Sequence, residues 1–426
     1  MNTQRETAGS SIYRKGALAR KSSLKQTLKH FLDRIGINNL RTEIKNILKH
    51  FLQLKGHQSF IQNVNNSHYS KKCLLVYITY PFEVPAENIS DSHQNQKQAV
   101  EMARVIGTFG YNVDVAAFPN TYTLRHIKGK YDLIIDIQTL RTPDFWAKNM
   151  NDSCKLVIYS TGSSLIFSYA QEHKRLDDLE RRRGVRLQPR RSLTKPGQEK
   201  IIESANAFWH IGNSYNLHTY DYLKLPPVYF IKNTGYNFGW VRNDIIRDKR
   251  NFVFFASGGQ VHKGLDLLLE IFGREGFGCN LYVCSSFMNE EDFCSEYRRE
   301  LFERPNIFPV GWVDINGQVF REVTEKCAYV IMPSCSEGLA GSVLTVMSAG
   351  VIPIVSKECG YDDDEAINLP DCRIETIEQY ISEYSHKPDA WIREHSEKYM
   401  NIARTRFSFE SFSRSVHDAM TAITTM

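Results

Sequence analysis

The sequence predicts an α/β protein with two doubly wound, Rossmann-like domains that face each other across a cleft, preceded by an N-terminal helical arm. Short runs rich in Val, Ile, Leu and Phe alternate with stretches of helical periodicity, as in parallel sheets covered on both faces. The alternation weakens between residues 233 and 250 and then restarts. A chain of 426 residues is also long enough for two or three cores.

The arm, assigned to residues 1–70, differs in charge from the rest of the chain. It carries 12 Lys and Arg against 3 Asp and Glu, whereas the remainder carries 41 against 45. Apolar residues recur at helical spacing from Leu24 to Ile35 and from Leu40 to Phe51, which predicts two basic amphipathic helices. These helices suit an anionic membrane surface, or equally a helical hairpin packed on the body or on a second subunit.

Residues 71–235 are assigned to the first, acceptor-side domain. In such sheets, polar residues beyond the carboxyl ends of the strands face the ligand cleft. The candidates for contact with an acceptor, the second substrate of a group transfer, are His93, Thr161 and Ser163. Asp136 is a candidate for an acceptor contact or a catalytic base, or else for a structural carboxylate that caps a loop. The predicted strands are residues 73–79, 113–118, 131–136, 155–160 and 207–211, with a helix at 93–109.

Residues 236–405 are assigned to the second domain, and residues 406–426 to a docked C-terminal helix. Phe412, Val416 and Met420 repeat at helical spacing in that last segment. The predicted strands of the second domain are residues 252–255, 280–284, 307–310, 328–332 and 351–355.

Two loops of the second domain have the form of phosphate-binding turns. A glycine-bearing loop with one carboxylate, Glu337, joins an apolar strand to a helix within Pro333–Gly350, and the free amides at such a helix N-terminus favour a phosphate or sugar hydroxyls. Upstream, Gly258 and Gly259 precede Lys263, which places an ammonium beside a turn that lets phosphate approach closely. Together the two loops predict a nucleotide-sugar site.

Other classes of site are disfavoured. The nine cysteines contain no C-x-x-C pair, so neither disulfides nor a zinc site are expected. The run Asp362–Asp364 is interpreted as a solvated loop, and no metal or cofactor is predicted. No apolar run reaches the roughly 18 to 20 residues of a membrane span, so we expect a cytoplasmic protein, with peripheral attachment to the membrane as an option.

A basic run, Arg181–Arg183, lies in the first domain. Such a run is either a solvated face or a surface for anionic headgroups or a lipid pyrophosphate. Nucleic acid is not expected, because no aromatic residues are interleaved with the basic ones. The sequence allows a homo-oligomer without specifying one.

The block 251–356 resembles the donor domain of GT-B fold glycosyltransferases of the retaining family 4 type. The similar motifs are the Gly turn and Lys-Gly of Ser257–Gly264, the strand and loop of Asn306–Asp314, and the "PS..EG" loop of Pro333–Gly341. The resemblance extends more weakly over residues 71–426.

This resemblance implies a role for each matching residue. Lys263 would bind the donor diphosphate and Glu337 the hydroxyls of the donor sugar. The sequence departs from the family at Thr345, where a second glutamate usually binds ribose, and near Gly258 and Gly259, where an arginine is missing. The predicted catalytic residues are Glu337, Lys263 and Asp136, and the predicted donor-binding residues are Gly258, Gly259, Lys263, Gly311, Glu337, Gly338, Leu339, Ala340, Gly341 and Thr345.

The activity that the resemblance implies is metal-independent transfer of a sugar, with retention, from a nucleotide-sugar to a glycan or lipid-linked saccharide, as in cell-surface polysaccharide synthesis. Two alternatives stay open. One is a nucleotide-sugar epimerase, which shares the two-domain architecture. The other is a catalytically degenerate donor-binding partner of another transferase.

Overall fold

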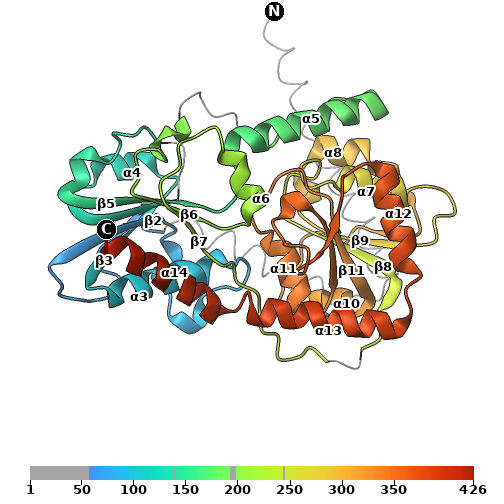
Figure 1. Cartoon of the computed structure of the whole chain (residues 1–426). Coiled ribbons are helices and arrows are strands. Elements are labelled where there is room, and N and C mark those ends of the chain that lie inside the picture. The colour runs from blue at the N-terminus through green and yellow to red at the C-terminus, as the bar shows by residue number, and fades with distance from the viewer. Residues whose placement is uncertain (1–56, 138–140, 192–197, 243–244) are drawn as a thin grey trace, which may run out of the picture.

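The computed structural model describes residues 57–137, 141–191, 198–242 and 245–426. The two helices expected in the basic arm lie outside the described residues. The rest forms two α/β domains, each built on one sheet (Figure 1). The last strand of the first sheet ends at Phe230 and the first strand of the second begins at Asp248, on either side of the predicted boundary.

The sheet of the first domain has the strand order β1-β3-β2-β4-β5-β6-β7 among the described residues. All neighbours pair in parallel except β1, which runs antiparallel to β3. The elements are β1 (Phe60–Ile61), β2 (Lys71–Tyr77), α3 (Asn95–Thr108), β3 (Tyr111–Ala117), α4 (Thr121–His126), β4 (Tyr131–Asp136), β5 (Met150–Ser160), α5 (Leu165–Arg183), β6 (Ala207–His210), α6 (Ser214–Leu217) and β7 (Val228–Phe230).

Strand β1 corrects the predicted end of the arm. Phe60 pairs with Ala116 and Ile61 with Val115, and the amide of Val64 donates to the carbonyl of Val113 at 2.8 Å. Residues from about Phe60 onward therefore belong to the first domain. A two-residue strand carries too little alternation to be seen in the sequence.

The sheet of the second domain is parallel throughout its described strands, in the order β10-β9-β8-β11-β12-β13. Every residue of its central strand β11 is buried, as helices on both faces require. The elements are β8 (Asp248–Phe255), α7 (Leu265–Phe272), β9 (Asn280–Cys284), α8 (Glu291–Glu296), α9 (Arg298–Glu303), β10 (Ile307–Phe308), α10 (Gln318–Lys326), β11 (Cys327–Met332), α11 (Gly341–Ser348), β12 (Ile352–Ser356), β13 (Ile367–Leu369), α12 (Ile374–Ser385), α13 (Asp389–Thr405) and α14 (Phe409–Thr424).

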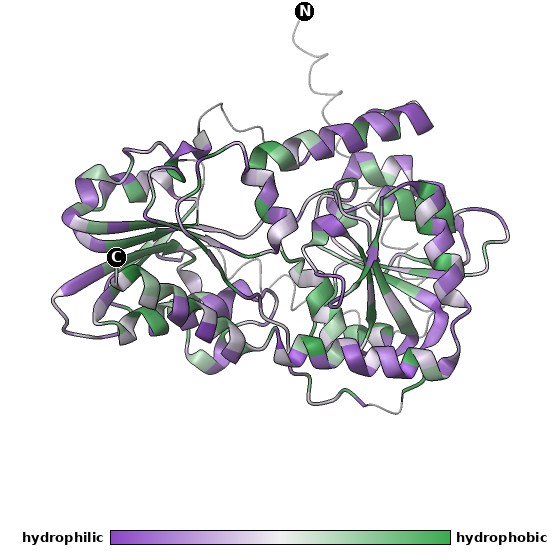
Figure 2. Cartoon of the chain, in the orientation of Figure 1, coloured by the Kyte–Doolittle hydropathy of each residue, from purple (hydrophilic) through white to green (hydrophobic). Residues whose placement is uncertain are grey.

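Hydropathy follows this layering. Figure 2 shows mostly hydrophobic strands in both sheets and helices with one hydrophobic and one hydrophilic side. Helix α14 returns to the first domain and lies beside α3 (Figure 1), where the hydroxyl of Ser413 donates to Glu101 Oε1 at 2.5 Å. The predicted C-terminal helix thus ties the two domains together.

Helix α5 makes a second link between the domains. It starts in the first domain and extends over α7 and α8 of the second (Figure 1). Arg182 Nη2 lies 2.8 Å from Asp266 Oδ2, and Arg183 Nε lies 2.5 Å from Glu296 Oε1. Two arginines of the basic run are therefore engaged in ion pairs between domains, whereas Arg181 pairs with Asp178 of its own helix.

Candidate active site

Lys263 lies in the turn between β8 and α7. Gly264, at the N-cap of α7, has φ of +83°, and a Cβ there would come within 2.4 Å of the carbonyl oxygen of Pro333. Glycine is therefore required both by the left-handed backbone and by the close approach of the next loop. This approach brings Lys263 to the loop after β11.

Glu337 lies in that loop, between β11 and α11. Its Oε1 atom is 2.5 Å from Lys263 Nζ and accepts a hydrogen bond from the hydroxyl of Ser334 at 3.2 Å. The Nε2–H of His262 donates to the carbonyl of Ser336 at 2.6 Å, which fixes the loop just before the carboxylate. Strands β8 and β11 are neighbours in the sheet, so their carboxyl ends place the two predicted residues side by side.

The environment keeps Glu337 ionised. Burial alone would raise the pKa of this carboxyl, but the Lys263 ammonium, together with His262 and Arg191, outweighs burial and the pKa falls to about 2. Burial also lowers the pKa of His262 to about 3, with Arg191 acting in the same direction. Near neutral pH Glu337 is therefore a carboxylate and His262 a neutral imidazole. Glu337 cannot serve as a general acid.

The Gly258-Gly259 turn already holds an anionic group. The amide of Gly259 donates to Glu290 Oε1 at 2.5 Å, and the amide of Gln260 donates to Glu290 Oε2 at 3.2 Å. Arg190, which follows α5, reaches the same carboxylate with its Nε at 3.4 Å. The turn thus has the anion-binding character expected of it, with a carboxylate of the chain as its present partner.

The N-terminus of α11 is contacted from the first domain. Gln94 Nε2 donates to the carbonyl of Gly341 at 2.8 Å and to the hydroxyl of Thr345 at 3.3 Å. That hydroxyl itself donates to Gly341 O at 2.8 Å. Of the predicted loop amides, that of Ala340 donates to the carbonyl of Cys359 at 2.9 Å. Gln94 therefore contacts Thr345, the residue that stands where the glycosyltransferase family usually has its second glutamate.

His93 precedes Gln94 at the start of α3. Desolvation lowers the pKa of His93, and a contact with Asn95 opposes this effect while the ammonium of Lys263 adds to it. Its imidazole is therefore neutral near pH 7. The structure thus places this predicted acceptor-side residue next to Gln94, which contacts the N-terminus of α11.

Thr161 and Ser163 lie where the two domains touch. The amide and hydroxyl of Ser163 both donate to the carbonyl of Glu337, at 3.0 and 2.6 Å. A Cβ on Gly338 would come within 2.5 Å of the carbonyl oxygen of Thr161. Ser163 thus positions the main chain of Glu337 from the first domain, a contact that the sequence alone did not indicate.

Asp136 requires a correction. It has no exposed surface, and its Oδ2 atom accepts hydrogen bonds from Arg141 Nε at 2.6 Å and Trp146 Nε1 at 2.8 Å. A fully buried carboxylate held by two donors cannot reach an acceptor. The geometry therefore assigns Asp136 the structural role and not that of a catalytic base.

The remaining predictions concern residues away from the pair. Gly311, after β10, has φ of +88° and donates its amide to the carbonyl of Val283 at 3.1 Å. Asp364 of the acidic run lies 2.6 Å from Arg406. Within the described ranges, no group of three or more His, Cys, Asp or Glu side chains could hold a metal ion, and no helix is both long and apolar enough to cross a bilayer.

Sequence reasoning missed Gln94, Glu290 and Arg190. Each reaches the site from a segment without a phosphate-type motif. A local pattern therefore gave no signal for them. Packing within the second domain brings Glu290 to the loops, and packing between the two domains brings Gln94 and Arg190 there.

The fold is that of GT-B glycosyltransferases: two facing domains with parallel sheets and a C-terminal helix that returns to the first domain. Solved structures with this fold include sucrose-phosphate synthase from Thermosynechococcus elongatus, which is 12% identical with a TM-score of 0.55 over 83% of this chain and 99% of that one. No protein-family model and no curated protein sequence matches the chain.

Two further structures cover the same share of this chain. HepE from Anabaena, solved with UDP-glucose, is 12% identical with a TM-score of 0.52 over 83% of this chain and 100% of that one. The lipopolysaccharide outer core galactosyltransferase WaaB, solved in its apo form, is 12% identical with a TM-score of 0.51 over 83% and 99%. At such identities the similarity establishes the fold.

Proposed function

We propose that the chain is a retaining glycosyltransferase that moves a sugar from a nucleotide-sugar to a glycan or lipid-linked saccharide. The Lys263–Glu337 contact of 2.5 Å carries the proposal, because it joins two phosphate-type loops at the carboxyl ends of adjacent parallel strands, where open α/β sheets bind ligands. The fold shared with HepE and WaaB, which are described with a nucleotide-sugar and as a galactosyltransferase, supports this reaction class.

Each side chain has a role that fits its charge. The Lys263 ammonium neutralises the diphosphate as it leaves, and the ionised Glu337 accepts hydrogen bonds from hydroxyls of the donor sugar. The side chain of Lys263 is 9% exposed and that of Glu337 is 16% exposed, so a donor enters by parting the domains at this interface. Transfer with retention needs no protein base if the leaving phosphate takes the acceptor proton.

Donor turnover tests the proposal. A panel of nucleotide-sugars is supplied with and without glycan acceptors and with EDTA, and released nucleotide is measured. Acceptor-dependent release that persists in EDTA is the expected result. An isomerised donor without release would instead support an epimerase, and binding without turnover would support a donor-binding partner.

Lys263→Gln is the matched variant for this assay. We expect it to lower kcat/KM by about 100-fold, the loss typical of one preorganised group at a developing charge. Arg181→Gln is the control, since Arg181, among the residues that the structure describes, pairs within its own helix α5. Normal turnover by Lys263→Gln would remove this lysine from the donor site.

We also propose that the basic arm attaches the enzyme to anionic membranes, where a lipid-linked acceptor would be found. The net charge of +9 over residues 1–70 supports this, at about 1 kcal/mol per basic residue near the surface. The test is co-sedimentation with vesicles containing anionic lipid, with and without residues 1–56. Equal sedimentation of both forms would refute the attachment.

A further inference from the structure

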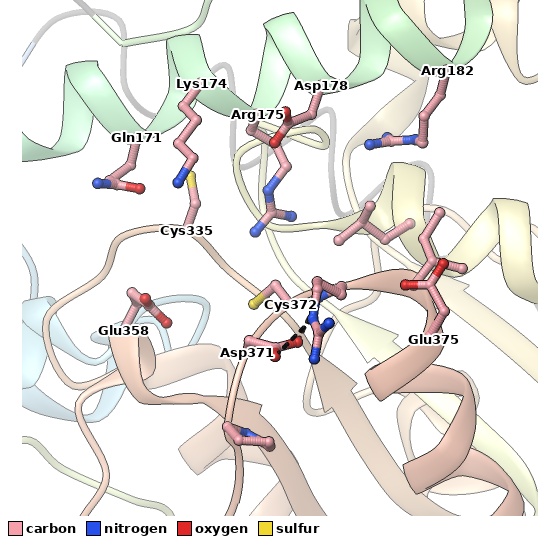
Figure 3. A pocket seen from close by; sticks show the side chains of 14 residues that line it. Gln171, Lys174, Arg175, Asp178, Arg182, Cys335, Glu358, Asp371, Cys372 and Glu375 are labelled. Carbon is pink, nitrogen blue, oxygen red and sulfur yellow. Dashed lines mark hydrogen bonds and ion pairs between the residues drawn. The ribbon is translucent and has the colours of Figure 1, made fainter.

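A cavity of about 450 Å³ lies between α5 of the first domain and the second domain (Figure 3). Its walls come from α5, from Cys335 in the loop after β11, and from the segment that joins β13 to α12. Neither Lys263 nor Glu337 lines it. Its volume falls within the range of small-molecule sites.

Arg175 projects from α5 into this space (Figure 3) and is only 7% exposed. Its Nη2 donates to the carbonyl of Pro333 at 3.1 Å, whereas its Nη1 is buried and has no hydrogen-bond partner among the described residues. Cys372 comes from the opposite wall (Figure 3) and its thiol contacts Arg175; burial raises the pKa of this thiol to about 11, so it brings no negative charge near pH 7. A buried guanidinium with an unused donor is suited to an anionic acceptor.

Lys174 points into the same space from the preceding position (Figure 3). It forms no hydrogen bond or ion pair with any part of the chain that the structure describes. This ammonium is therefore a second cation available to a ligand.

Most acids of the cavity are already engaged. Asp371 lies 2.9 Å from Arg373, and Asp178 pairs with Arg181. Glu358 accepts a hydrogen bond from the hydroxyl of Tyr215 at 3.1 Å. Among the lining acids this leaves Glu358, whose partner is a neutral hydroxyl, and Glu375, in the first turn of α12, where the positive end of the helix dipole offsets part of its charge. Lys174 and Arg175 therefore face two carboxylates without an ion-pair partner among the described residues, and the feature that favours an anionic ligand is the unused donor of the buried Arg175.

We propose that this cavity binds a small oxyanion, the phosphoryl or carboxylate group of a metabolite, through Arg175 and Lys174. The site is separate from the proposed donor site, and its existence does not rest on the proposed function. It adjoins the loop that carries Glu337: Arg175 holds Pro333, and the hydroxyls of Ser168 on α5 and Ser336 lie 2.6 Å apart. A bound oxyanion therefore acts on the guanidinium that also fixes this loop.

The test measures binding of inorganic phosphate, pyrophosphate and citrate to the full chain by calorimetry in the millimolar range. Lys174→Gln is the main variant, because this exposed side chain has no partner among the described residues whose loss would disturb folding. Arg175→Lys keeps the buried positive charge but removes the planar guanidinium and its pair of terminal donors. Arg186→Gln, just after α5, is the control, because Arg186 pairs with Asp177 and Glu180 and neither acid lines the cavity. Lys263→Gln detects binding of a probe at the donor loops.

We expect at least one probe to bind the wild type and Arg186→Gln alike. Lys174→Gln should weaken its binding about tenfold, which corresponds to about 1.4 kcal/mol for one charge-assisted hydrogen bond. Hydrogen exchange in residues 333–341 should slow on binding in the wild type and change less in Lys174→Gln. The proposal is overturned if no probe binds, or if Lys263→Gln abolishes binding while Lys174→Gln keeps it. It is also overturned if neither Lys174→Gln nor Arg175→Lys alters the affinity.

Discussion

Two carboxylates hold similar places in the two domains but have opposite surroundings. Asp136 closes β4 of the first sheet, and Glu337 follows β11 of the second. Each contacts a basic side chain, Arg141 Nε at 2.6 Å and Lys263 Nζ at 2.5 Å. Asp136 has no exposed surface and also accepts from Trp146, whereas 16% of the Glu337 side chain is exposed.

The comparison shows that neither residue type nor position on a strand separates a structural carboxylate from one available to a ligand. Asp136 is held by donors from its own domain that follow it within ten residues. Glu337 lies at an interface between domains, and its partner comes from a different loop. The two carboxylates differ in their exposure to solvent and in which segments supply their hydrogen-bond and ion-pair partners. Both are properties of the tertiary structure.

The largest effect is expected for Asp136→Asn. This change leaves Arg141, which is 5% exposed, without its counter-charge, and breaking a buried pair costs about 3 to 5 kcal/mol. Urea unfolding of the first domain is the measurement. A loss below about 1 kcal/mol, the level of an exposed pair, would show that the pair is not structural.

Glu337→Gln should reverse this pattern. We expect turnover to fall by about 100- to 1,000-fold, with a smaller loss of stability than in Asp136→Asn because the site is partly open. The measurements are nucleotide release and urea unfolding of the same preparations. Near-normal turnover would exclude Glu337 from the site. If the variant were unfolded instead, Glu337 would have a structural role like that of Asp136.

The sequence predicted the second domain better than the first for a physical reason. Lys263 and Glu337 lie in continuous strand-loop-helix segments, and β8 and β11 are neighbours, so local patterns were sufficient to predict both loops. The groups that complete the site, Gln94 and Glu290, are brought there only by packing between elements. The short strands β1, β7 and β13, of two or three residues, lack the apolar run that would mark them.

Asp266 extends the comparison to a carboxylate for which burial dominates. It lies in the first turn of α7 with no exposed surface, and burial raises its pKa from 3.8 to about 6 despite Arg175 and Arg182. The folded state then binds the proton more tightly than the unfolded state, so this residue's contribution to stability falls as pH rises from about 4 to 6.

The matched variant for this titration is Asp266→Asn. Relative to it, the wild type should lose up to about 3 kcal/mol between pH 4 and 6, since each unit of pKa shift is worth about 1.4 kcal/mol. Urea unfolding of both proteins across this range gives the difference. A difference that stays constant with pH, or that grows in favour of the wild type, would contradict the raised pKa.

The smallest effect concerns the basic run, whose members the sequence could not distinguish. Consecutive residues of a helix face different directions. Arg183 contacts Glu296 and Glu300 of the second domain at 2.5 and 2.9 Å and stacks over the ring of Tyr297 at 4.5 Å, whereas Arg181 pairs within α5.

Arg183→Ala should therefore cost about 1 kcal/mol, more at low salt than at high salt, because its pairs are partly exposed. Arg181→Ala should stay within about 0.5 kcal/mol of the wild type. Hydrogen exchange in the second half of α5 would reveal whether the helix loosens from the second domain. Equal responses of the two variants would mean that Arg183 contributes no more than an exposed residue, and that the association of α5 with the second domain depends on the contacts of Arg175 and Arg182.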